Sequence, residues 1–332
     1  TTLFRSKPKA GILTHGQMAF VVNNHLADLI PGTNENDCSI AVAPLSHGAG
    51  IHALLNVARG AATILMPSEK FDPAMFWECV ERYKVTNLFT VPTIIKMLVE
   101  HPAVDQYDHS SLRYVIYAGA PMYRADQKRA LEKLGKVLVQ YFGLGEVTGN
   151  ITVLPPSMHS ADDTDPNANI GSCGRPRVGM EVAILNDKMQ ELPCGEVGEI
   201  CVRGPAVFAG YFGNDEATQK ALRGGWFHTG DIGSLDDDGT IMFHGRFKDM
   251  LKVGGENVAA AEVEAVFGVA AHQLIDQFLH RIALLMFLRQ GDADQAAAGR
   301  VHGRRVDAGH RRDGGRGAED PRAPRCHGHR RR

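Results

Sequence analysis

The sequence predicts an α/β protein in which a parallel sheet covered by helices is followed by a smaller, β-rich subdomain. Apolar strand-like runs alternate with helical segments from residue 39 to residue 142, and this alternation is typical of parallel sheets, whose strands are joined by crossover helices. From residue 181 the strand-like runs are shorter and separated by turns, which favours an antiparallel or barrel-like arrangement. Polarity rises after Gly245, which predicts a linker or hinge.

Short apolar runs mark the expected strands of the first half, and a proline or a glycine follows each run within two residues. Pro92 suits the first turn of a helix, where its missing N–H has no partner to lose. The strands are expected at residues 39–43, 61–66, 85–91, 112–117 and 136–142, and the helices at residues 76–83, 93–100 and 123–134.

The second half is expected to hold strands at residues 181–185, 198–202 and 240–243, with a turn at residues 236–239. After Gly245 a polar cluster predicts the hinge, and a helix is expected to begin at Ala259 and to reach residue 267. The cluster consists of Lys248, Asp249, Lys252, Gly254 and Gly255.

Composition divides the chain into four expected parts. Residues 1–6 resemble the translation of a sequencing-adapter oligonucleotide and are expected to be a non-native leader. Residues 7–245 are expected to form the core, and residues 246–270 are expected to form the hinge and the start of a small α+β C-terminal domain. The last lysine is Lys252, and from Arg300 onward there are eleven arginines and no aromatic residue. Because such a composition cannot bury a core, residues 271–332 are expected to be a frame-shifted or disordered tail, the alternative being a basic arm that binds nucleic acid.

Overall composition excludes several classes of protein. The chain has 332 residues and a net charge of −2, so as a whole it carries no field that would recruit nucleic acid or an anionic membrane. Its six cysteines include no CxxC pair, which argues against a zinc site or a disulfide framework and suits a reducing compartment. No apolar run is long enough to span a bilayer and no secretory leader is visible, so a cytoplasmic protein is expected.

Two early segments have the composition of a ligand pocket. Lys9 lies beside small residues and leads through a short strand into a polar turn, as an anion-binding loop requires, although a plain surface turn would look the same. His47 follows a strand and precedes Gly48-Ala49-Gly50, small residues that let a ligand approach the backbone. A lone histidine is otherwise more often structural.

Two strand ends carry further candidates. Gly119, Ala120 and Pro121 follow one expected parallel strand and leave room for a flat ring, and ligands of open α/β sheets bind at such carboxyl ends. The next strand ends in Phe142 and Gly143, with Glu146 close behind, which supplies an aromatic surface, an accessible backbone and a carboxylate for Mg²⁺. Tight strand–helix turns are the alternative.

A carboxylate and a guanidinium recur in the second half. Asp231 follows a glycine in WFHTGD and suits the two hydroxyls of a ribose. Arg246 lies fifteen residues later and can reach the same sugar or its phosphate with a planar fork. Charged clusters are usually solvated faces, but several in this order favour a nucleotide site.

At this point the chain resembles the adenylate-forming superfamily, which includes acyl-CoA synthetases, firefly luciferase and the adenylation domains of peptide synthetases. The resemblance runs from about residue 7 to about residue 267. The motifs that carry it are KPKAGILTHG, APLSHGAG, YAGAP, YFGLGE, IGSCGRP, ELPCGEVGEICVRG, GGWFHTGDIG and GRFKDMLKVGGENV, which occur in the family's order. It implies a large N-terminal domain of parallel sheets and a distorted barrel, truncated here, then a hinge and an incomplete small C-terminal domain.

The resemblance implies a role for each candidate residue in the nucleotide site. Lys9 closes the phosphate loop, and Glu146 binds Mg²⁺. Gly119, Ala120 and Pro121 flank the adenine, on which Phe142 stacks beside Gly143. Asp231 holds the ribose hydroxyls, and Arg246 contacts the ribose and phosphate.

Other residues are implied in the transfer step. His47 lines the junction of the acyl and pantetheine pockets. Lys248 is the hinge about which the C-terminal domain rotates, and Gly254 and Gly255 belong to the loop that approaches the pantetheine tunnel. Glu146, Lys248 and His47 are therefore the expected catalytic residues.

The implied reaction activates a fatty or aromatic acid with ATP and Mg²⁺ to an acyl-adenylate, then transfers it to CoA. Three departures from the family's pattern predict impaired adenylation. The phosphate loop is expected just before Lys7, where the adapter-like residues 1–6 stand instead, and no lysine follows Lys252, where the family has a late lysine. Gly145 replaces the family's hydroxyl residue, a smaller departure because related acyl-CoA ligases tolerate glycine there. The alternatives are a non-catalytic remnant that binds AMP or an acyl-adenylate, adenylation without CoA transfer, and a nucleic-acid-binding tail.

Overall fold

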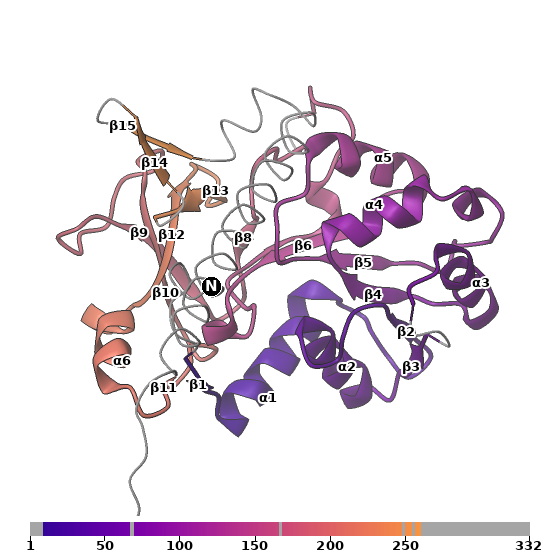
Figure 1. The fold of residues 1–332 in the computed structure, drawn as a ribbon, viewed down its shortest axis with the longest axis horizontal. Coiled ribbons are helices and arrows are strands. Elements are labelled where there is room, and N and C mark those ends of the chain that lie inside the picture. The colour runs from indigo at the N-terminus through magenta and orange to yellow at the C-terminus, as the bar shows by residue number, and fades with distance from the viewer. Residues whose placement is uncertain (1–8, 67–69, 166–167, 248–249, 254–255, 260–332) are drawn as a thin grey trace, which may run out of the picture. The chain divides into compact units, whose positions relative to one another are not determined.

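A seven-stranded sheet forms the larger part of the computed structural model (Figure 1), which describes residues 9–66, 70–165, 168–247, 250–253 and 256–259. The chain divides after Val266 into two units, and the described residues all belong to the first. The strand order is β3-β2-β4-β5-β6-β7-β8. The strands are β2 (Cys38–Ala41), β3 (Ala62–Leu65), β4 (Asn87–Thr90), β5 (Tyr114–Tyr117), β6 (Leu138–Phe142), β7 (Thr152–Leu154) and β8 (Arg175–Pro176).

Parallel pairing joins β3, β2, β4, β5 and β6. β7 pairs antiparallel with β6, and β8 pairs antiparallel with β7. The prediction of a parallel sheet from five strands is therefore confirmed. Helices cover it: α1 (His15–Asn24), which continues as the π-helical turn η1 (His25–Leu29), α2 (Gly48–Ala58), α3 (Pro73–Tyr83), α4 (Pro92–Glu100), the 3₁₀ turn η2 (Pro102–Asp105) and α5 (Arg124–Leu134).

The strands are apolar on both faces because helices cover both faces. Leu88, Val115 and Leu138 pack into one core with residues of α3, α4 and α5. Their chain neighbours Phe89, Ile116 and Val139 point the other way and pack with Ala49 and Leu55 of α2 and with the end of η1. The predominance of apolar residues in the strand-forming runs of the sequence follows from this double burial.

Local signals set several helix starts. Thr14 caps α1 through a capping box with Gln17, in which each side chain bonds the other's backbone N–H. Asp72 caps α3, and Pro73 occupies the first turn. Pro92 begins α4 in the position that its sequence context predicts.

A four-stranded antiparallel sheet forms the second part, in the order β13-β12-β10-β9. Its strands are β9 (Glu181–Leu185), β10 (Gly198–Arg203), β12 (Phe227–Leu235) and β13 (Ile241–Arg246). The turn at residues 236–239 joins β12 to β13 as predicted, closed by the backbone of Asp236 and Thr240. Smaller elements are β1 (Gly11–Ile12), which pairs with β11 (Gly210–Tyr211), α6 (Asp215–Ala221), and the 3₁₀ turns η3 (Gly145–Val147), η4 (Pro156–Met158) and η5 (Arg223–Gly225).

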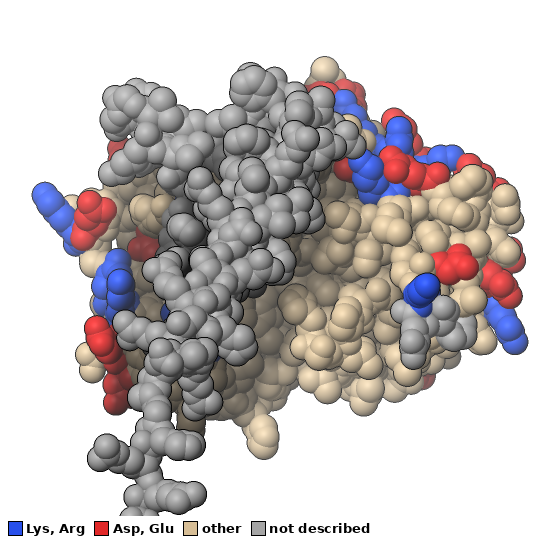
Figure 2. Space-filling view, viewed as in Figure 1, with Lys and Arg blue, Asp and Glu red and all other residues tan. Residues whose placement is uncertain are grey.

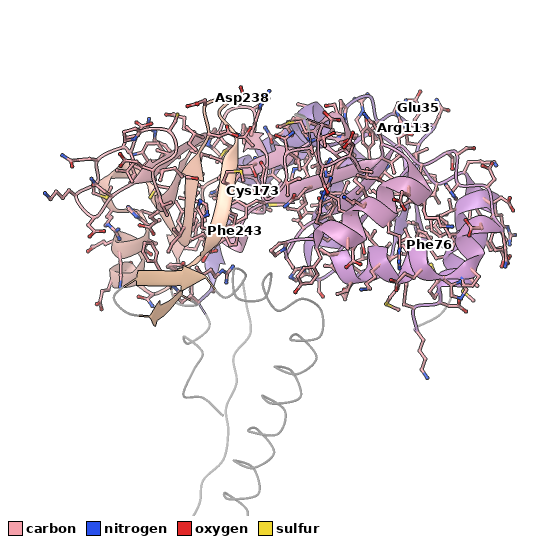
Figure 3. All side chains as sticks on the ribbon, turned by 90° about the horizontal axis from the view of Figure 1, so that it is seen from above. Glu35, Phe76, Arg113, Cys173, Asp238 and Phe243 are labelled. Carbon is pink, nitrogen blue, oxygen red and sulfur yellow. The ribbon has the colours of Figure 1, made fainter. Side chains whose placement is uncertain are left out.

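A third apolar cluster joins α1 and the segment after β6 to the smaller sheet. It contains Val21 of α1 and Val147 of η3, together with Ile200, Val202 and Phe227 of the smaller sheet. Phe76 lies among the helices of the larger sheet in Figure 3, whereas Cys173 and Phe243 lie among the strands of the smaller one. This cluster fixes the carboxyl end of β6 against β12 and β13.

The region after Gly245, which is expected to hold a linker or hinge, contains strands. β13 continues through Arg246, and β14 (Met250–Val253) pairs with β15 (Glu256–Ala259) in an antiparallel hairpin. Ala259, the expected first residue of a helix, is instead the last residue of β15, because it pairs with Met250. The rest of that predicted helix lies outside the described residues.

Charged side chains on the face drawn in Figure 2 alternate in sign over α4 and α5. Arg124 and Lys128 both pair with Asp163, and Arg129 pairs with Glu100. Among the described residues, no helix has the length and apolar character that a membrane crossing requires.

Candidate functional site

Glu146 lies in η3, directly after the carboxyl end of β6, and is held by Tyr211 of β11. The Tyr211 hydroxyl donates a 2.7 Å hydrogen bond to Glu146 Oε1. Burial of the phenol, together with its hydrogen bond to Glu146 and the charge of that carboxylate, raises the pKa of Tyr211. The hydroxyl therefore keeps its proton at physiological pH and remains a donor.

Lys9 reaches the same tyrosine from the start of the described chain. Its Nζ lies 4.2 Å from the centroid of the Tyr211 ring, a distance at which an ammonium is attracted to the aromatic face. Pairing of Gly11 with Tyr211, and the 2.8 Å bond from Phe212 N to Ala10 O, bring the two segments together. A cation and a carboxylate from distant parts of the sequence thus meet at one phenol.

Asp231 and Arg246 form an ion pair across β12 and β13. They are register partners, and Arg246 Nε lies 3.1 Å from Asp231 Oδ1. The Asp231 side chain is 1% exposed and that of Arg246 is 60% exposed. The Asp231 carboxylate is therefore buried beneath an arginine whose side chain is largely exposed.

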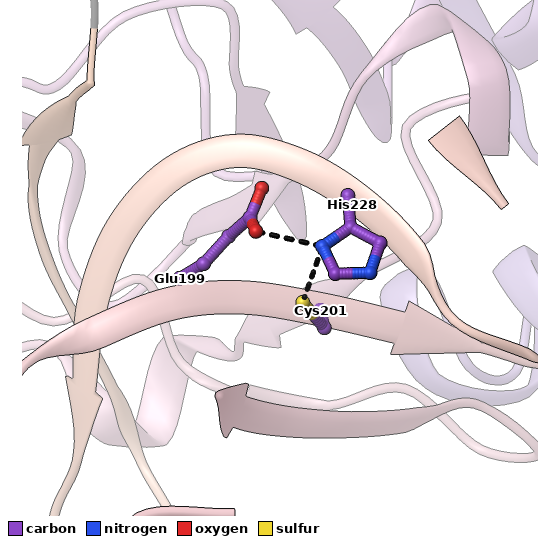
Figure 4. A group of neighbouring side chains, drawn as sticks. All are labelled: Glu199, Cys201 and His228. Atoms are coloured by element: carbon purple, nitrogen blue, oxygen red, sulfur yellow. Dashed lines mark hydrogen bonds and ion pairs between the residues drawn. The ribbon is translucent and has the colours of Figure 1, made fainter. Parts of the chain in front are cut away.

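A bulge in β12 presents Asp231. Pairing shifts between Glu199 and Cys201, so that Ile200 alone stands opposite residues 229–231, and Gly230 has a φ of 74° that favours glycine. The glycine turn expected before Asp231 is thus a bulge within a strand. Glu199 Oε1 accepts a 3.1 Å bond from Gly230 N and braces the bulge. Figure 4 shows that Glu199 also accepts from His228 Nδ1, at 2.7 Å.

Phe142 connects the two sheets at this point. Its ring centroid lies 5.7 Å from that of Phe243, on the same strand as Arg246, and the two planes are inclined by 50°. Gly143 is enclosed: a Cβ there would lie 2.3 Å from the carbonyl carbon of Gly149. Gly143 is therefore required for packing, whether or not a ligand approaches it.

Gly119, Ala120 and Pro121 are exposed and follow the carboxyl end of β5. β5 and β6 are parallel neighbours, and Tyr117 pairs with Gln140, so this segment and Phe142 leave the sheet at the same edge. Gly119 has a φ of 85°, where glycine is favoured. The structure therefore brings these residues to one edge of the sheet, as the sequence predicts.

His47 is exposed and lies at the N-terminus of α2 without making a side-chain cap. The glycines after it have packing roles, whether or not a ligand approaches the backbone there. A Cβ at Gly48 would lie 2.7 Å from Phe89 Cζ, and one at Gly50 would lie 2.1 Å from Leu45 O. A cavity of about 10 Å³, lined in part by Leu45, Ala49, His52 and Phe89, lies beside this turn.

Three predicted residues, Lys248, Gly254 and Gly255, lie outside the described residues. Sequence reasoning also missed two residues that hold the site, Tyr211 and Glu199. Tyr211 follows a glycine in a two-residue strand, which is too short for any periodic signal. Glu199 stands in the GEICVRG segment, where its acceptor role depends on the opposite strand.

Comparisons with known proteins agree with this architecture. The family model described as "AMP-binding enzyme" matches residues 6–212. A feruloyl-CoA synthase of Amycolatopsis sp is 37% identical over 260 residues, which are 78% of this chain and 50% of that protein. A medium/long-chain-fatty-acid–CoA ligase of Mycobacterium tuberculosis is 33% identical, over 82% of this chain and 45% of its own length.

Solved structures give the same result. The amide bond synthetase McbA of Marinactinospora thermotolerans has a TM-score of 0.70 at 34% identity, over 77% of this chain and 51% of its own. The O-succinylbenzoate CoA synthetase of Bacillus subtilis, in complex with ATP and magnesium, has a TM-score of 0.70 at 28% identity, over 80% of this chain and 53% of its own. The chain spans about half the length of the curated relatives that it matches. On the breadth of the family match, the chain belongs to the AMP-binding enzymes.

Proposed function

We propose that the protein activates a carboxylic acid, aromatic or fatty, with ATP to form an acyl-adenylate and pyrophosphate, and then transfers the acyl group to CoA. The observation that carries the proposal is that Phe142 contacts Phe243 on the strand of Arg246, and that Arg246 pairs with Asp231. Glu146 follows Phe142 by four residues and is held by Tyr211, which belongs to the apolar cluster that Phe142 and Phe243 pack against. Relatives named as feruloyl-CoA synthase and fatty-acid–CoA ligase support the acid class and the thiol acceptor.

The nucleotide is proposed to lie along the carboxyl edge of β5 and β6. Its adenine packs on Phe142 and against residues 119–121, and its ribose hydroxyls bond the Asp231 carboxylate. Arg246 is more than half exposed, so its guanidinium can leave one carboxylate oxygen and contact the sugar or the phosphate.

Glu146 is proposed as the protein ligand of Mg²⁺. The residues fit such an ion, because Mg²⁺ is commonly bound through one or two carboxylates together with substrate phosphates. When bound, the ion neutralises charge on the phosphates during attack at the α-phosphorus. Tyr211 holds Glu146 Oε1, which leaves Oε2 to face the ion, and Lys9 adds a positive charge nearby.

The transfer step is proposed to use residues around α2 and after β13. His47 stands at the exposed N-terminus of α2, beside the turn that the acyl group would pass. Lys248 is proposed as the hinge, and Gly254 and Gly255 as the loop that approaches the pantetheine arm. Because no lysine follows Lys252, we expect this chain to adenylate slowly while still binding nucleotide.

A second acceptor is suggested by the name of one structural relative. The amide bond synthetase McbA has a TM-score of 0.70 at 34% identity, which is below the 37% identity of the feruloyl-CoA synthase, so CoA is the proposed acceptor and an amine is the second candidate. Parallel reactions with CoA and with a simple amine, followed by mass spectrometry of the acyl product, distinguish the two acceptors.

Calorimetric titration with AMP and with a non-hydrolysable acyl-adenylate analogue tests the nucleotide site, and acid-dependent pyrophosphate release tests turnover. Asp231→Asn is expected to weaken AMP binding roughly tenfold, since a charged acceptor is lost. Asp238→Asn, in the exposed turn after the same strand, is the matched control and should bind as the wild type does. Equal affinity of both variants would refute the proposed site, whereas binding without any turnover would support a non-catalytic remnant.

A further inference from the structure

Three side chains with metal-binding atoms lie on one face of two paired strands in the smaller sheet. Glu199 and Cys201 are two residues apart on β10 and therefore point to the same side. His228 on β12 is the direct partner of Cys201 in the antiparallel register. Two candidate ligands come from one strand and a third from its neighbour (Figure 4).

The distances among these atoms come close to those of a tetrahedral site. Cys201 Sγ lies 3.4 Å from His228 Nδ1, Glu199 Oε2 lies 2.7 Å from the same nitrogen, and the three ligand atoms all lie within 4.8 Å of one another. Zinc bonds of about 2.0–2.3 Å to nitrogen, oxygen and sulfur place neighbouring ligands about 3.2–3.6 Å apart. The sulfur–nitrogen pair already fits, and the oxygen–nitrogen pair needs to open by less than about 1 Å.

We propose that Glu199, Cys201 and His228 bind one thiophilic divalent cation of the zinc class. The set of one sulfur, one nitrogen and one oxygen is typical of such ions, and it differs from the oxygen ligands that Mg²⁺ prefers. The site is separate from Glu146, and its existence does not depend on the proposed reaction.

The surroundings bury most of the cluster: the side chains of Cys201 and His228 are buried, and that of Glu199 keeps a small exposed fraction. Cys201 is buried with Ala183 and Leu185, and Met189 and Trp226 pack over them. Burial and the nearby Glu199 charge raise the pKa of Cys201 to about 12, so the free thiol is neutral and an incoming cation has to displace its proton.

Two groups respond when the cation enters. Arg223 Nη2 lies 3.3 Å from Glu199 Oε2, but its side chain is 47% exposed and can turn into solvent. His228 has to move its ring proton from Nδ1 to Nε2, which has no hydrogen-bond partner among the described residues. Nε2 is unpartnered in either tautomer, so the exchange leaves the number of unsatisfied groups unchanged.

Cobalt provides a direct test because a thiolate bound to Co²⁺ gives a charge-transfer absorption band that carboxylates and imidazoles do not give. The full chain is titrated with Co²⁺, and Zn²⁺ is then added as a competitor. We expect one equivalent of Co²⁺ to produce the band and Zn²⁺ to abolish it. Cys201→Ser should remove the band and weaken Zn²⁺ binding roughly 100-fold.

The matched control is Cys326→Ser, because Cys326 lies beside His327 and His329 in the sequence and could bind cobalt independently. This control should keep the full band. His228→Gln retains the thiol but loses the nitrogen ligand, and it should weaken cobalt binding even if Cys201→Ser fails to fold. A band that survives Cys201→Ser or His228→Gln unchanged, or that disappears in Cys326→Ser, would overturn the proposed site, as would the absence of any band in the wild type.

Discussion

Replacing Tyr211 with phenylalanine tests whether Glu146 is held in position for a metal ion. The substitution keeps the ring that packs with Phe208 and the aromatic face under Lys9, and removes only the hydroxyl that donates to Glu146 Oε1. A hydrogen bond to a charged acceptor contributes about 1.5–3 kcal/mol. Because Glu146 is only half-buried, water replaces part of that bond, and about 1–1.5 kcal/mol remains.

That loss predicts two different responses. Binding of ATP with Mg²⁺ should weaken by about tenfold, since about 1.4 kcal/mol corresponds to a factor of ten. Binding of AMP without metal should stay within about twofold, because its adenine and ribose contacts lie at Phe142 and Asp231. Isothermal titration of both ligands, with Mg²⁺ varied for ATP, measures the difference.

The matched control is Tyr114→Phe, which also removes a hydroxyl, one that donates to Pro31 O at 2.8 Å away from the site. It should leave both affinities unchanged. If Tyr211→Phe weakened the binding of AMP as much as the binding of ATP with Mg²⁺, the tyrosine would act through the fold rather than through Glu146. If neither affinity changed, Tyr211 would have no role in the metal site.

Three further outcomes follow from other buried groups. Glu199→Gln should lower the free energy of unfolding by about 1–2 kcal/mol, because His228 and Gly230 lose a charged hydrogen-bond acceptor. Glu196→Gln, at an exposed position, should leave the free energy of unfolding unchanged, and urea unfolding measures both variants. Arg177→Met should cost about 3–5 kcal/mol in the same assay, since it leaves Asp28 without its buried partner. Burial, and to a smaller extent the charge of Arg177, lower the pKa of His52 to about 3. In the unfolded chain the same imidazole takes up a proton near pH 6.5, whereas in the folded protein it stays neutral. The free energy of unfolding therefore falls as the pH drops from 7 to 5. His52→Phe, which keeps the ring stacked on Phe89, should reduce that fall by about 2 kcal/mol; an unchanged pH profile would contradict the assignment.

The sequence predicts the larger sheet well because its strands are buried on both faces. Residues 85–91 and 136–142 are apolar at most of their positions, and each run contains the strand that the structure places there, β4 and β6. The predicted runs extend one or two residues beyond these strands, because apolar residues such as Val85 and Val137 pack into the helix-covered core outside the strands. The turn at residues 236–239 was equally clear, because Asp-Gly at its end suits a tight reversal.

Elements with weaker patterns were missed for identifiable reasons. β12 contains a bulge at Gly230 and polar residues on both sides of it, which removes the alternation that marks a strand. β1 and β11 have two residues each and exist only as partners of one another. The Lys9–Tyr211–Glu146 contact depends on that pairing, so no local pattern could have placed Tyr211 in the site.

The cysteine pattern illustrates the same limit. The absence of a CxxC pair argues only against a metal site built from one continuous loop, in which both ligands come from the same turn. Glu199, Cys201 and His228 instead come together through the register of two strands, which sequence spacing does not encode. A search for ligands at i and i+2 on one expected strand would have selected Glu199 and Cys201, but the third ligand requires the pairing of β10 with β12.

Strand register, more than any single motif, makes the candidate nucleotide site possible. Asp231 faces Arg246 only because β12 and β13 pair in the observed alignment, and a slip by one residue would place the two side chains on opposite faces. The shift between Ile232 and Gly233 absorbs one extra residue on β13, so that Asp231 meets Arg246 while Gly233 still pairs with Phe243. Phe243 is the ring that contacts Phe142 at the end of β6. One irregularity in one pair of strands therefore sets both the carboxylate–guanidinium couple and the aromatic contact that joins it to the larger sheet.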